Sequence, residues 1–253
     1  MTHTVTVTCT SLDKIVWDPP GTGDLAEGTV HVWRASLRQQ KAALEKYFQE
    51  LSPEEKKGAS RFFRTEDRNR FLLGRKMLRT LISLAIAIPP ETVAIQTDSN
   101  GKPYFISKDE RPLFFNLSHS GNWVLIAIGL SASGVDVEAI NQAIEVEELS
   151  AACFSAEEQQ ALQKASDPLP AFYTFWTRKE ALLKATGIGL INELSHFSCL
   201  NGFNSVTANI IRSNKDWNIQ SFRLDEGHFA SVATVPGTVC RFYNFNFLCP
   251  CVY

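Results

Sequence analysis

The feature that most constrains the fold of this chain is a repeat between its two halves. The segments Ser52–Lys76 and Ser155–Lys179 superpose without a gap under a shift of 103 positions. Under that shift Ser52, Glu54, Glu55, Arg75 and Lys76 fall on identical residues, namely Ser155, Glu157, Glu158, Arg178 and Lys179. The repeat predicts two similar halves, and a cleft between such halves is a natural place for a ligand.

Both copies of the repeat carry the residues with which α-helices begin. In the first copy, Ser52 suits an N-cap, Pro53 the first helical position and Glu55 the capping-box partner. In the second copy, Ser155 and Glu158 hold the corresponding positions. The pattern therefore predicts a helical stretch that opens at the same place in both halves.

Strands are predicted outside these helical stretches. The run Asn122–Leu130 is apolar at its centre and is bounded by Gly121 and a Ser-Ala-Ser-Gly turn at 131–134, which is typical of a buried strand. Weaker strand patterns cover 92–96 and 218–224. The turn at 131–134 is the strongest candidate for a domain boundary.

Helices and strands in two related halves predict an α+β fold. With 253 residues and 44% hydrophobic content, the chain is long enough to bury a sizeable core without disulfide staples. We expect two pseudo-symmetric α+β subdomains, residues 1–132 and 133–253, with the active site in the cleft between them.

Composition and charge exclude several classes of function. The formal net charge of −2 argues against a general attraction to nucleic acid or to an anionic membrane. The first ten residues lack the basic and apolar regions of a leader, and the apolar run 81–90 is too short to span a bilayer. The six cysteines include no Cys-x-x-Cys pair, and the five histidines show no zinc-ligand spacing. We expect a cytoplasmic protein with no nucleic-acid or membrane partner.

Two carboxylates lie two positions apart in the segment Gly134-Val135-Asp136-Val137-Glu138. In a strand, Asp136 and Glu138 point to one face while the valines point to the other. A hard divalent cation bound by oxygen, Mg²⁺ or Mn²⁺, relieves the repulsion within such a pair. A solvated strand face is the simpler interpretation of these residues taken alone.

A strong helix-forming segment follows at 175–185. Trp176, Glu180 and Lys184 recur at i, i+4 and i+8, and therefore form one stripe with Lys179 beside it. Glu180 and Lys184 have the favourable order for a surface ion pair. A carboxylate between two lysines is also what a site for a metal and a phosphate requires.

Two polar segments of the first half are typical of phosphate-binding loops and equally of ordinary turns. Ser99–Pro103 is a turn by composition, which would present backbone amides and the ammonium of Lys102 to a nucleotide. Asn116–Gly121 places hydroxyls, backbone amides and the imidazole of His119 directly before the buried strand.

The stretch from Leu51 to Thr80 is basic, with nine Lys or Arg against four Asp or Glu. If this stretch formed one unbroken helix, six of its cations would share a stripe: Lys57, Arg61, Arg64, Arg68, Arg75 and Arg79. Base-stacking aromatics and groove-reading motifs are not interleaved with these cations. The stretch therefore favours a compact polyanion or an acidic protein partner over nucleic acid.

Together these segments resemble the Sfp-type 4′-phosphopantetheinyl transferases, from about Leu51 to Leu190. The likeness rests on the order and spacing of five motifs: Gly101-Lys102-Pro103, Asn116-Leu117-Ser118-His119-Ser120, Gly134-Val135-Asp136-Val137-Glu138, Phe154-Ser155-x-x-Glu158 and Trp176-x-x-Lys179-Glu180-Ala181-x-x-Lys184. The family is built as two pseudo-symmetric halves, which agrees with the repeat. This chain departs from the family where Glu55 and Gly58 stand at positions that are lysine in some members.

The resemblance implies a metal site and a coenzyme A site. Asp136, Glu138 and Glu180 would bind Mg²⁺, with Mn²⁺ as a substitute, and Lys184 would meet the pyrophosphate of coenzyme A. The remaining contacts to coenzyme A would come from Arg70, Gly101, Lys102, Pro103, Ser118 and His119.

The resemblance also implies the reaction, in which the 4′-phosphopantetheine arm of coenzyme A moves to a serine of an apo acyl or peptidyl carrier protein and 3′,5′-ADP is released. The base that deprotonates this serine would be Glu180, Glu158 or a metal-bound water. A magnesium-dependent phosphohydrolase acting on coenzyme A or another nucleotide, and a non-catalytic module that binds a carrier protein, remain as alternatives. We expect the transferase, acting as a monomer on an acidic carrier protein.

Overall fold

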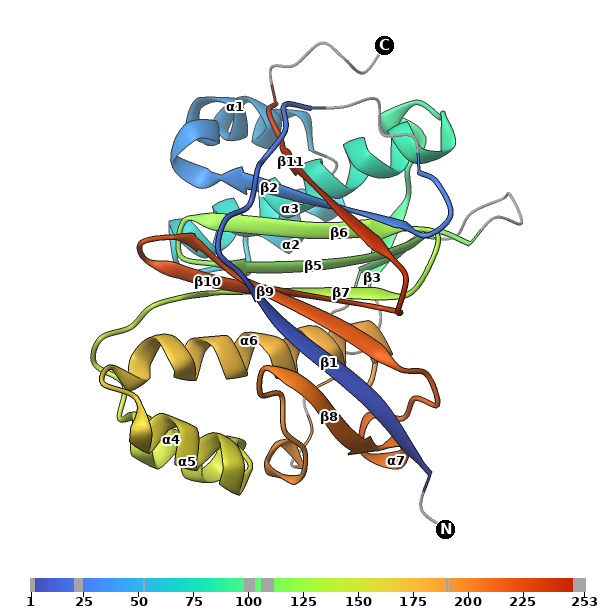
Figure 1. The fold of residues 1–253 in the computed structure, drawn as a ribbon. Coiled ribbons are helices and arrows are strands. Elements are labelled where there is room, and N and C mark those ends of the chain that lie inside the picture. The colour runs from blue at the N-terminus through green and yellow to red at the C-terminus, as the bar shows by residue number, and fades with distance from the viewer. Residues whose placement is uncertain are drawn as a thin grey trace. The chain divides into compact units, whose positions relative to one another are not determined.

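A computed structural model describes residues 3–20, 25–51, 53–97, 103–105, 112–189, 191 and 193–247. Runs of strands and runs of helices follow one another along the chain (Figure 1), which confirms the α+β class. None of the helices in this described part of the chain is both long enough and apolar enough to cross a membrane.

The chain divides into two compact units, which we call unit 1 and unit 2. Unit 1 contains Met1–Ile15 and Ser131–Val239, and unit 2 contains Val16–Leu130 and Cys240–Tyr253. The internal division lies at the turn that the sequence favours as a boundary. The termini differ from the expected subdomains 1–132 and 133–253, because the first strand belongs to unit 1 and the last segment to unit 2.

Unit 1 is built on a five-stranded sheet with the strand order β7-β10-β9-β1-β8. β1 lies inside this sheet, antiparallel to β8 and parallel to β9. These pairings join residues about 200 positions apart, and they explain why the N-terminal strand leaves the first half of the chain. The strands are β1 (Thr4–Leu12), β7 (Ser133–Ala139), β8 (Gly202–Thr207), β9 (Trp217–Asp225) and β10 (His228–Thr234).

One long helix of unit 1, α6 (Pro168–Thr186), packs on strands β7, β10 and β9. The shorter helices are α4 (Val146–Cys153), α5 (Ala156–Lys164) and α7 (Ala208–Ile211), and a 3₁₀ turn covers Leu194–His196. α5 begins with the predicted capping box, in which Ser155 accepts a hydrogen bond from the Glu158 amide.

Unit 2 is built on a four-stranded sheet with the order β11-β2-β6-β5 and a separate β3-β4 hairpin. Its core joins Trp33 and Ile126 of the sheet to Leu73 and Met77 of the long helix. The strands are β2 (Thr29–Ser36), β3 (Ile95–Thr97), β4 (Pro103–Phe105), β5 (Phe114–Ser120), β6 (Trp123–Gly129) and β11 (Val239–Asn244). The helices are α1 (Leu37–Glu50), α2 (Pro53–Ala59) and α3 (Thr65–Ile86), with a 3₁₀ turn at Pro90–Thr92.

The internal repeat is visible in the helix boundaries. α2 and α5 begin 103 positions apart, at residues 53 and 156, and α3 and α6 begin 103 positions apart, at residues 65 and 168. Each unit thus contains a short helix followed by a long helix in the same register. This agreement confirms that the two halves share a local architecture.

Most of the predicted strands are present, and one predicted helix is interrupted. β6 and β9 confirm the runs 122–130 and 218–224, whereas the run 92–96 is divided between the 3₁₀ turn and β3. The basic stretch does not form one helix, because α2 ends at Ala59 and α3 begins only at Thr65. The single stripe of six cations is therefore absent. Ser52, the predicted N-cap of the helix that begins at Pro53, lies outside the described residues.

Candidate functional site

The close approach of α6 to β7 in unit 1 depends on Gly134. A Cβ atom at this position would lie 2.1 Å from the carbonyl oxygen of Ala181 and 2.4 Å from the amide nitrogen of Ala185. Only a residue without a side chain permits this contact between the helix backbone and the strand. The last two turns of α6 are thereby held directly over β7.

The carboxylates of β7 lie on the face that α6 covers. Asp136 is paired with Ser231 of β10, and the hydroxyl of Ser231 lies 2.8 Å from that of Thr177 on α6. Val135 and Val137 are fully buried and point to the opposite face. The alternation expected from the sequence therefore directs Asp136 and Glu138 toward the helix.

Lys184 contacts Asp136 across this helix–strand contact. Its Nζ lies 2.6 Å from Oδ1 of Asp136, whose side chain is 2% exposed. The favourable spacing of Glu180 and Lys184 along the helix had suggested a surface pair between those two residues. Lys184 instead forms its ion pair with a buried strand carboxylate, because α6 lies so close to β7.

Glu180 is the most strongly perturbed carboxyl group of this cluster. Burial raises its pKa to about 7, the charges of Asp136 and Glu138 act in the same direction, and Lys184 opposes them. Its Oε1 atom is buried and has no hydrogen-bond partner among the described residues. A carboxyl group with these properties either holds a proton near neutral pH or awaits a cation.

The three carboxylates fit a hard divalent cation in chemistry, although they do not form a finished ligand set. Within the described residues, no three side chains of the Asp, Glu, His and Cys types converge closely enough to hold a metal ion. Lys184 supplies the positive charge beside Asp136 in this arrangement. The unsatisfied Oε1 of Glu180 is the atom that a cation would complete.

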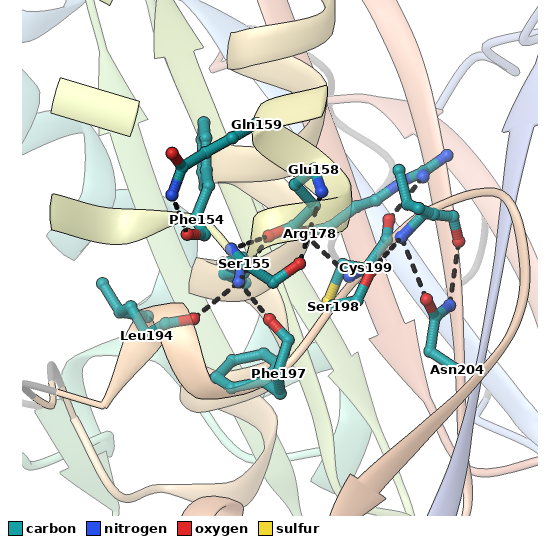
Figure 2. Close-up of polar contacts among 12 residues, drawn as sticks. Phe154, Ser155, Glu158, Gln159, Arg178, Leu194, Phe197, Ser198, Cys199 and Asn204 are labelled. Atoms are coloured by element: carbon teal, nitrogen blue, oxygen red, sulfur yellow. Dashed lines mark hydrogen bonds and ion pairs between the residues drawn. The ribbon is translucent and has the colours of Figure 1, made fainter. Parts of the chain in front are cut away.

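The structure gives Glu158 a different environment from the other predicted site residues. Figure 2 shows its carboxylate accepting hydrogen bonds from the backbone amides of Ser155 and Cys199, each at 2.8 Å. Lys179 lies 2.8 Å from the same carboxylate, and both side chains are fully buried. These contacts leave no exposed oxygen on Glu158, so the geometry does not favour it as the base that deprotonates a substrate.

Unit 2 carries a pocket of about 710 Å³ between α2, α3 and β5. Its apolar walls are side chains of Phe62, Phe71, Leu78, Ile95 and Leu117. Four cationic residues also line it: Lys57, Arg61, Arg70 and Arg75. Aromatic and aliphatic walls with several cations suit a flat ring that carries phosphate groups.

Two of these arginines are fixed by neighbouring groups. Arg70 donates to the carbonyl oxygen of Gly121 at 2.7 Å and forms an ion pair with Asp67. Arg75 lies over the ring of Phe71, with its guanidinium carbon 5.3 Å from the ring centroid. Burial lowers the pKa of Arg75 from the ordinary arginine value. Both guanidinium groups are therefore held as fixed cations.

Glu55, which lines the pocket, takes part in a second ion pair. Arg79 lies 2.5 Å from Glu55 and donates to the hydroxyl of Tyr47 at 2.8 Å. Glu55 thus joins α2 to α3, at a position where some transferases of the resembling family carry lysine. The acidic residue is accommodated because Arg79 neutralises it.

The predicted coenzyme A contacts divide into three groups. Arg70, Pro103 and His119 line the pocket of unit 2. Ser118 is 6% exposed and is not a lining residue, because neighbours in a strand point to opposite faces. Gly101 and Lys102 lie outside the described residues.

Sequence reasoning missed the walls of this pocket. No sequence pattern singled out Phe62 or Phe71, and Arg75 was noted in the repeat and in the basic stretch but not as a coenzyme A contact. Gly74 was a usable signal, because glycine inside a helix often marks a close approach. A Cβ at Gly74 would lie 2.7 Å from Cδ1 of Leu117, so glycine lets α3 pack against β5.

Comparison with known proteins covers most of the chain. Residues 32–130 match the family described as 4′-phosphopantetheinyl transferase, N-terminal, and residues 132–235 match the 4′-phosphopantetheinyl transferase superfamily. The chain is also similar to the 4′-phosphopantetheinyl transferase HetI of a Nostoc species, with 35% identity over 179 residues that cover 69% of this chain and 76% of HetI. The chain belongs to the Sfp-type 4′-phosphopantetheinyl transferase family.

Two further transferases of this family show the same extent of similarity. The 4′-phosphopantetheinyl transferase psf-1 of Bacillus pumilus is 33% identical over 196 residues, which cover 75% of this chain and 82% of psf-1. The 4′-phosphopantetheinyl transferase Sfp of Bacillus subtilis is 30% identical over 190 residues, which cover 74% of this chain and 84% of Sfp. The family matches include both the carboxylates of unit 1 and the pocket of unit 2.

Proposed function

We propose that this transferase moves the 4′-phosphopantetheine arm of coenzyme A to a serine of an apo carrier protein and releases 3′,5′-ADP with the help of Mg²⁺. The observation that carries the proposal is the cluster of Asp136, Glu180 and Lys184 in unit 1. It combines a 2.6 Å ion pair with a carboxyl group whose pKa is raised to about 7. Membership of the family supplies the reaction class.

The side chains of the cluster suit transfer of a substituted phosphoryl group. Negative charge grows on the phosphate oxygens and on the leaving oxygen as the serine attacks, so catalysis depends on positioning and counter-charge. Lys184 would turn from Asp136 to the pyrophosphate once substrate is bound. Asp136, Glu138 and Glu180 would hold Mg²⁺, which would supply further counter-charge to these oxygens.

We assign the serine proton to Glu180 in preference to Glu158. Glu180 lies in the acidic cluster with Asp136 and Glu138, where the reacting phosphate and the attacking serine would be placed. Glu158 is fully buried and is held by an ion pair and two backbone amides. The position of Glu180 in the cluster and the engaged carboxylate of Glu158 therefore support Glu180 as the base.

The pocket of unit 2 supports the nucleotide part of the proposal. We propose that its apolar walls take the adenine of coenzyme A and that Arg70, Arg75 and His119 meet the phosphate on the ribose. The volume of about 710 Å³ is within the range of small-molecule sites. Glu55 and Gly58 replace lysines of some relatives, so Arg75 would carry a larger share of this phosphate contact here.

We also propose the kind of carrier protein that this enzyme modifies and its oligomeric state. The excess of cations between Leu51 and Thr80 supports an acidic carrier protein. We further propose a monomer that acts in the cytoplasm without nucleic acid or membrane. Light scattering of the purified protein tests the monomer, and a dimer or trimer mass would contradict it.

The intact mass of a purified apo acyl carrier protein tests the central reaction. After incubation with this protein, coenzyme A and Mg²⁺, the carrier should gain about 340 Da, the mass of one phosphopantetheine group. EDTA and Asp136→Ala should each abolish the gain. Asp13→Ala, which removes an exposed carboxylate of unit 1, is the matched control and should leave the gain intact.

The same incubation separates the alternatives. Release of 3′,5′-ADP at the same rate with and without a carrier would indicate a phosphohydrolase. Binding of a carrier without any mass gain, unchanged in Asp136→Ala, would indicate a non-catalytic carrier-binding module. Either result would overturn the proposed transferase.

A further inference from the structure

Three consecutive polar residues of α6 are completely buried, and each contacts a different part of unit 1. Thr177, Arg178 and Lys179 are all 0% exposed. Thr177 contacts Ser231 of β10 at 2.8 Å, and Arg178 donates through Nε to Ser221 of β9 at 2.7 Å. Successive residues of a helix point about 100° apart. Three such contacts therefore fix both the rotation and the height of α6.

Lys179 makes the contact on the side away from the sheet. Its Nζ donates to the carbonyl oxygens of Leu194 at 2.6 Å and Phe197 at 2.5 Å. It also lies 4.3 Å from the centroid of the Phe197 ring. An ammonium group has three donors and no acceptor, so Glu158 together with these two carbonyl groups satisfies it completely.

Glu158 connects this lysine to two further segments. Its carboxylate accepts from the amide of Ser155, at the start of α5, and from the amide of Cys199, in the segment that follows the 3₁₀ turn (Figure 2). Burial raises the pKa of Glu158 and Lys179 opposes that rise. The ion pair thus ties α5, α6 and residues 194–199 together.

Unit 2 makes a similar connection through the corresponding glutamate but through a different cation, because Lys179 corresponds to Lys76 and not to Arg79. Under the shift of 103 positions Glu158 corresponds to Glu55, and Glu55 also pairs with a cation of the long helix, Arg79, at 2.5 Å. The short helix is joined to the long helix by a glutamate in both units. Only in unit 1 is the pair completely buried and next in sequence to a reactive carboxyl group, Glu180.

We propose that Lys179, held by Glu158, is a positioning residue for the acidic site, because it fixes the rotation of α6 that directs Glu180 and Lys184 at β7. This inference rests on the proposed function, and in particular on a cation that the site would hold. A small rotation of α6 would separate Lys184 from Asp136, which are now 2.6 Å apart. It would also turn the unsatisfied Oε1 of Glu180 away from its neighbours.

The experiment compares wild-type protein with Lys179→Met/Glu158→Gln. The double variant leaves no buried charge without a partner, so it is expected to fold. Mn²⁺ affinity, measured by electron paramagnetic resonance without coenzyme A, is the direct readout, and thermal unfolding and steady-state kinetics accompany it. Asn204→Ala is the control, because the hydrogen bonds of Asn204 go to Leu200 and Gly202 and to Val7 and Cys9 of β1.

The dissociation constant for Mn²⁺ should rise about 10-fold or more in the double variant, as is usual when the support of a metal ligand is removed. The kcat should fall with the Mn²⁺ affinity, because Glu180 and Lys184 would no longer face the reacting phosphate. Asn204→Ala should lower the melting temperature and leave Mn²⁺ affinity unchanged. A purely structural ion pair would instead leave Mn²⁺ affinity and kcat per folded molecule at wild-type values in the double variant, which overturns the proposal.

Two further outcomes are separable. If the double variant does not fold, Glu158→Asp alone, which keeps a negative charge near Lys179 but shortens the side chain that holds it, should show a smaller loss of Mn²⁺ affinity, and wild-type affinity in that variant overturns the positioning role. If wild-type protein binds no Mn²⁺, the metal site fails and the positioning role with it. The carrier-mass assay then reports independently whether phosphopantetheine transfer itself occurs.

Discussion

Replacing Glu180 by glutamine is expected to stabilise the metal-free protein at pH 8. The pKa of this carboxyl group moves from its usual 4.5 to about 7, first through burial and then through the charges of Asp136 and Glu138. Keeping the group ionised at pH 8 therefore costs the folded state up to about 3 kcal/mol. Glutamine has nearly the same shape without the charge, so the variant avoids this cost while it loses the activity.

The pH dependence follows from the protons that each state binds. Between pH 4.5 and 7 the folded protein binds more protons than the unfolded chain, because only the folded state holds Glu180 protonated. The stabilising contribution of this group is complete below pH 4.5 and is lost as the pH rises through 7. The advantage of Glu180→Gln should therefore be small at pH 5 and should reach roughly 5–10 °C in melting temperature at pH 8.

Thermal unfolding by circular dichroism in EDTA, at pH 5 and at pH 8, measures this difference. Glu158→Gln is the matched comparison, because it also neutralises a buried carboxyl group but leaves the ammonium of Lys179 without its partner at 2.8 Å. That variant should be destabilised at both pH values. A Glu180→Gln protein no more stable than wild type at pH 8 would refute the account of this carboxyl group.

Three further predictions concern residues around the two sites. Lys184→Met should lower kcat by about 100-fold or more with intact carrier binding, because a counter-charge at the reacting phosphate is lost; a loss confined to KM in the carrier assay would argue against this role. Arg75→Ala should raise the KM for coenzyme A by about 10-fold, since a charged contact to phosphate is removed, and titration calorimetry that finds unchanged coenzyme A affinity would exclude the contact. Gly134→Ala should destabilise the protein by about 2 kcal/mol or more in urea unfolding, because its Cβ would lie 2.1 Å from a helix carbonyl oxygen. Gly58→Ala, whose Cβ meets nothing closer than 3.6 Å, should not destabilise it.

Local signals in the sequence predicted many individual elements. The capping residues Ser155 and Glu158 marked the start of α5, and the apolar run 122–130 marked β6. The alternating residues of 134–138 placed two carboxylates on one face of β7. These features depend on neighbours within a few positions, so the chain itself reveals them.

Long-range pairing and side-chain competition set the limit of such prediction. β1 enters the sheet of unit 1 between β8 and β9, and no local pattern specifies partners about 200 residues away. The sequence left Lys184 either in a surface pair with Glu180 or in a site for a metal and a phosphate, and only the close approach of α6 to β7 at Gly134 makes Asp136 its partner. Glu158 looked as reactive as Glu180 in the sequence, and only its burial against Lys179 distinguishes the two residues.

The sequence predicts the positive charge around the pocket of unit 2 but not the apolar walls that shape it. The cations between Leu51 and Thr80 indicated a polyanion, yet they reach the pocket from α2, from α3 and from the turn between these helices. Phe62, in the turn between α2 and α3, and Phe71, in α3, contribute apolar walls. The break between α2 and α3 and the close packing at Gly74 decide this arrangement. Neither feature can be inferred from the excess of cations in this stretch.

Anomalous diffraction from crystals grown with Mn²⁺ and coenzyme A tests the central claim most directly. The account predicts an anomalous peak about 2.1–2.2 Å from carboxylate oxygens of Asp136, Glu138 and Glu180, with Lys184 turned from Asp136 to the pyrophosphate. Coenzyme A bound with no peak at these carboxylates, or with Mn²⁺ at another site, would contradict it.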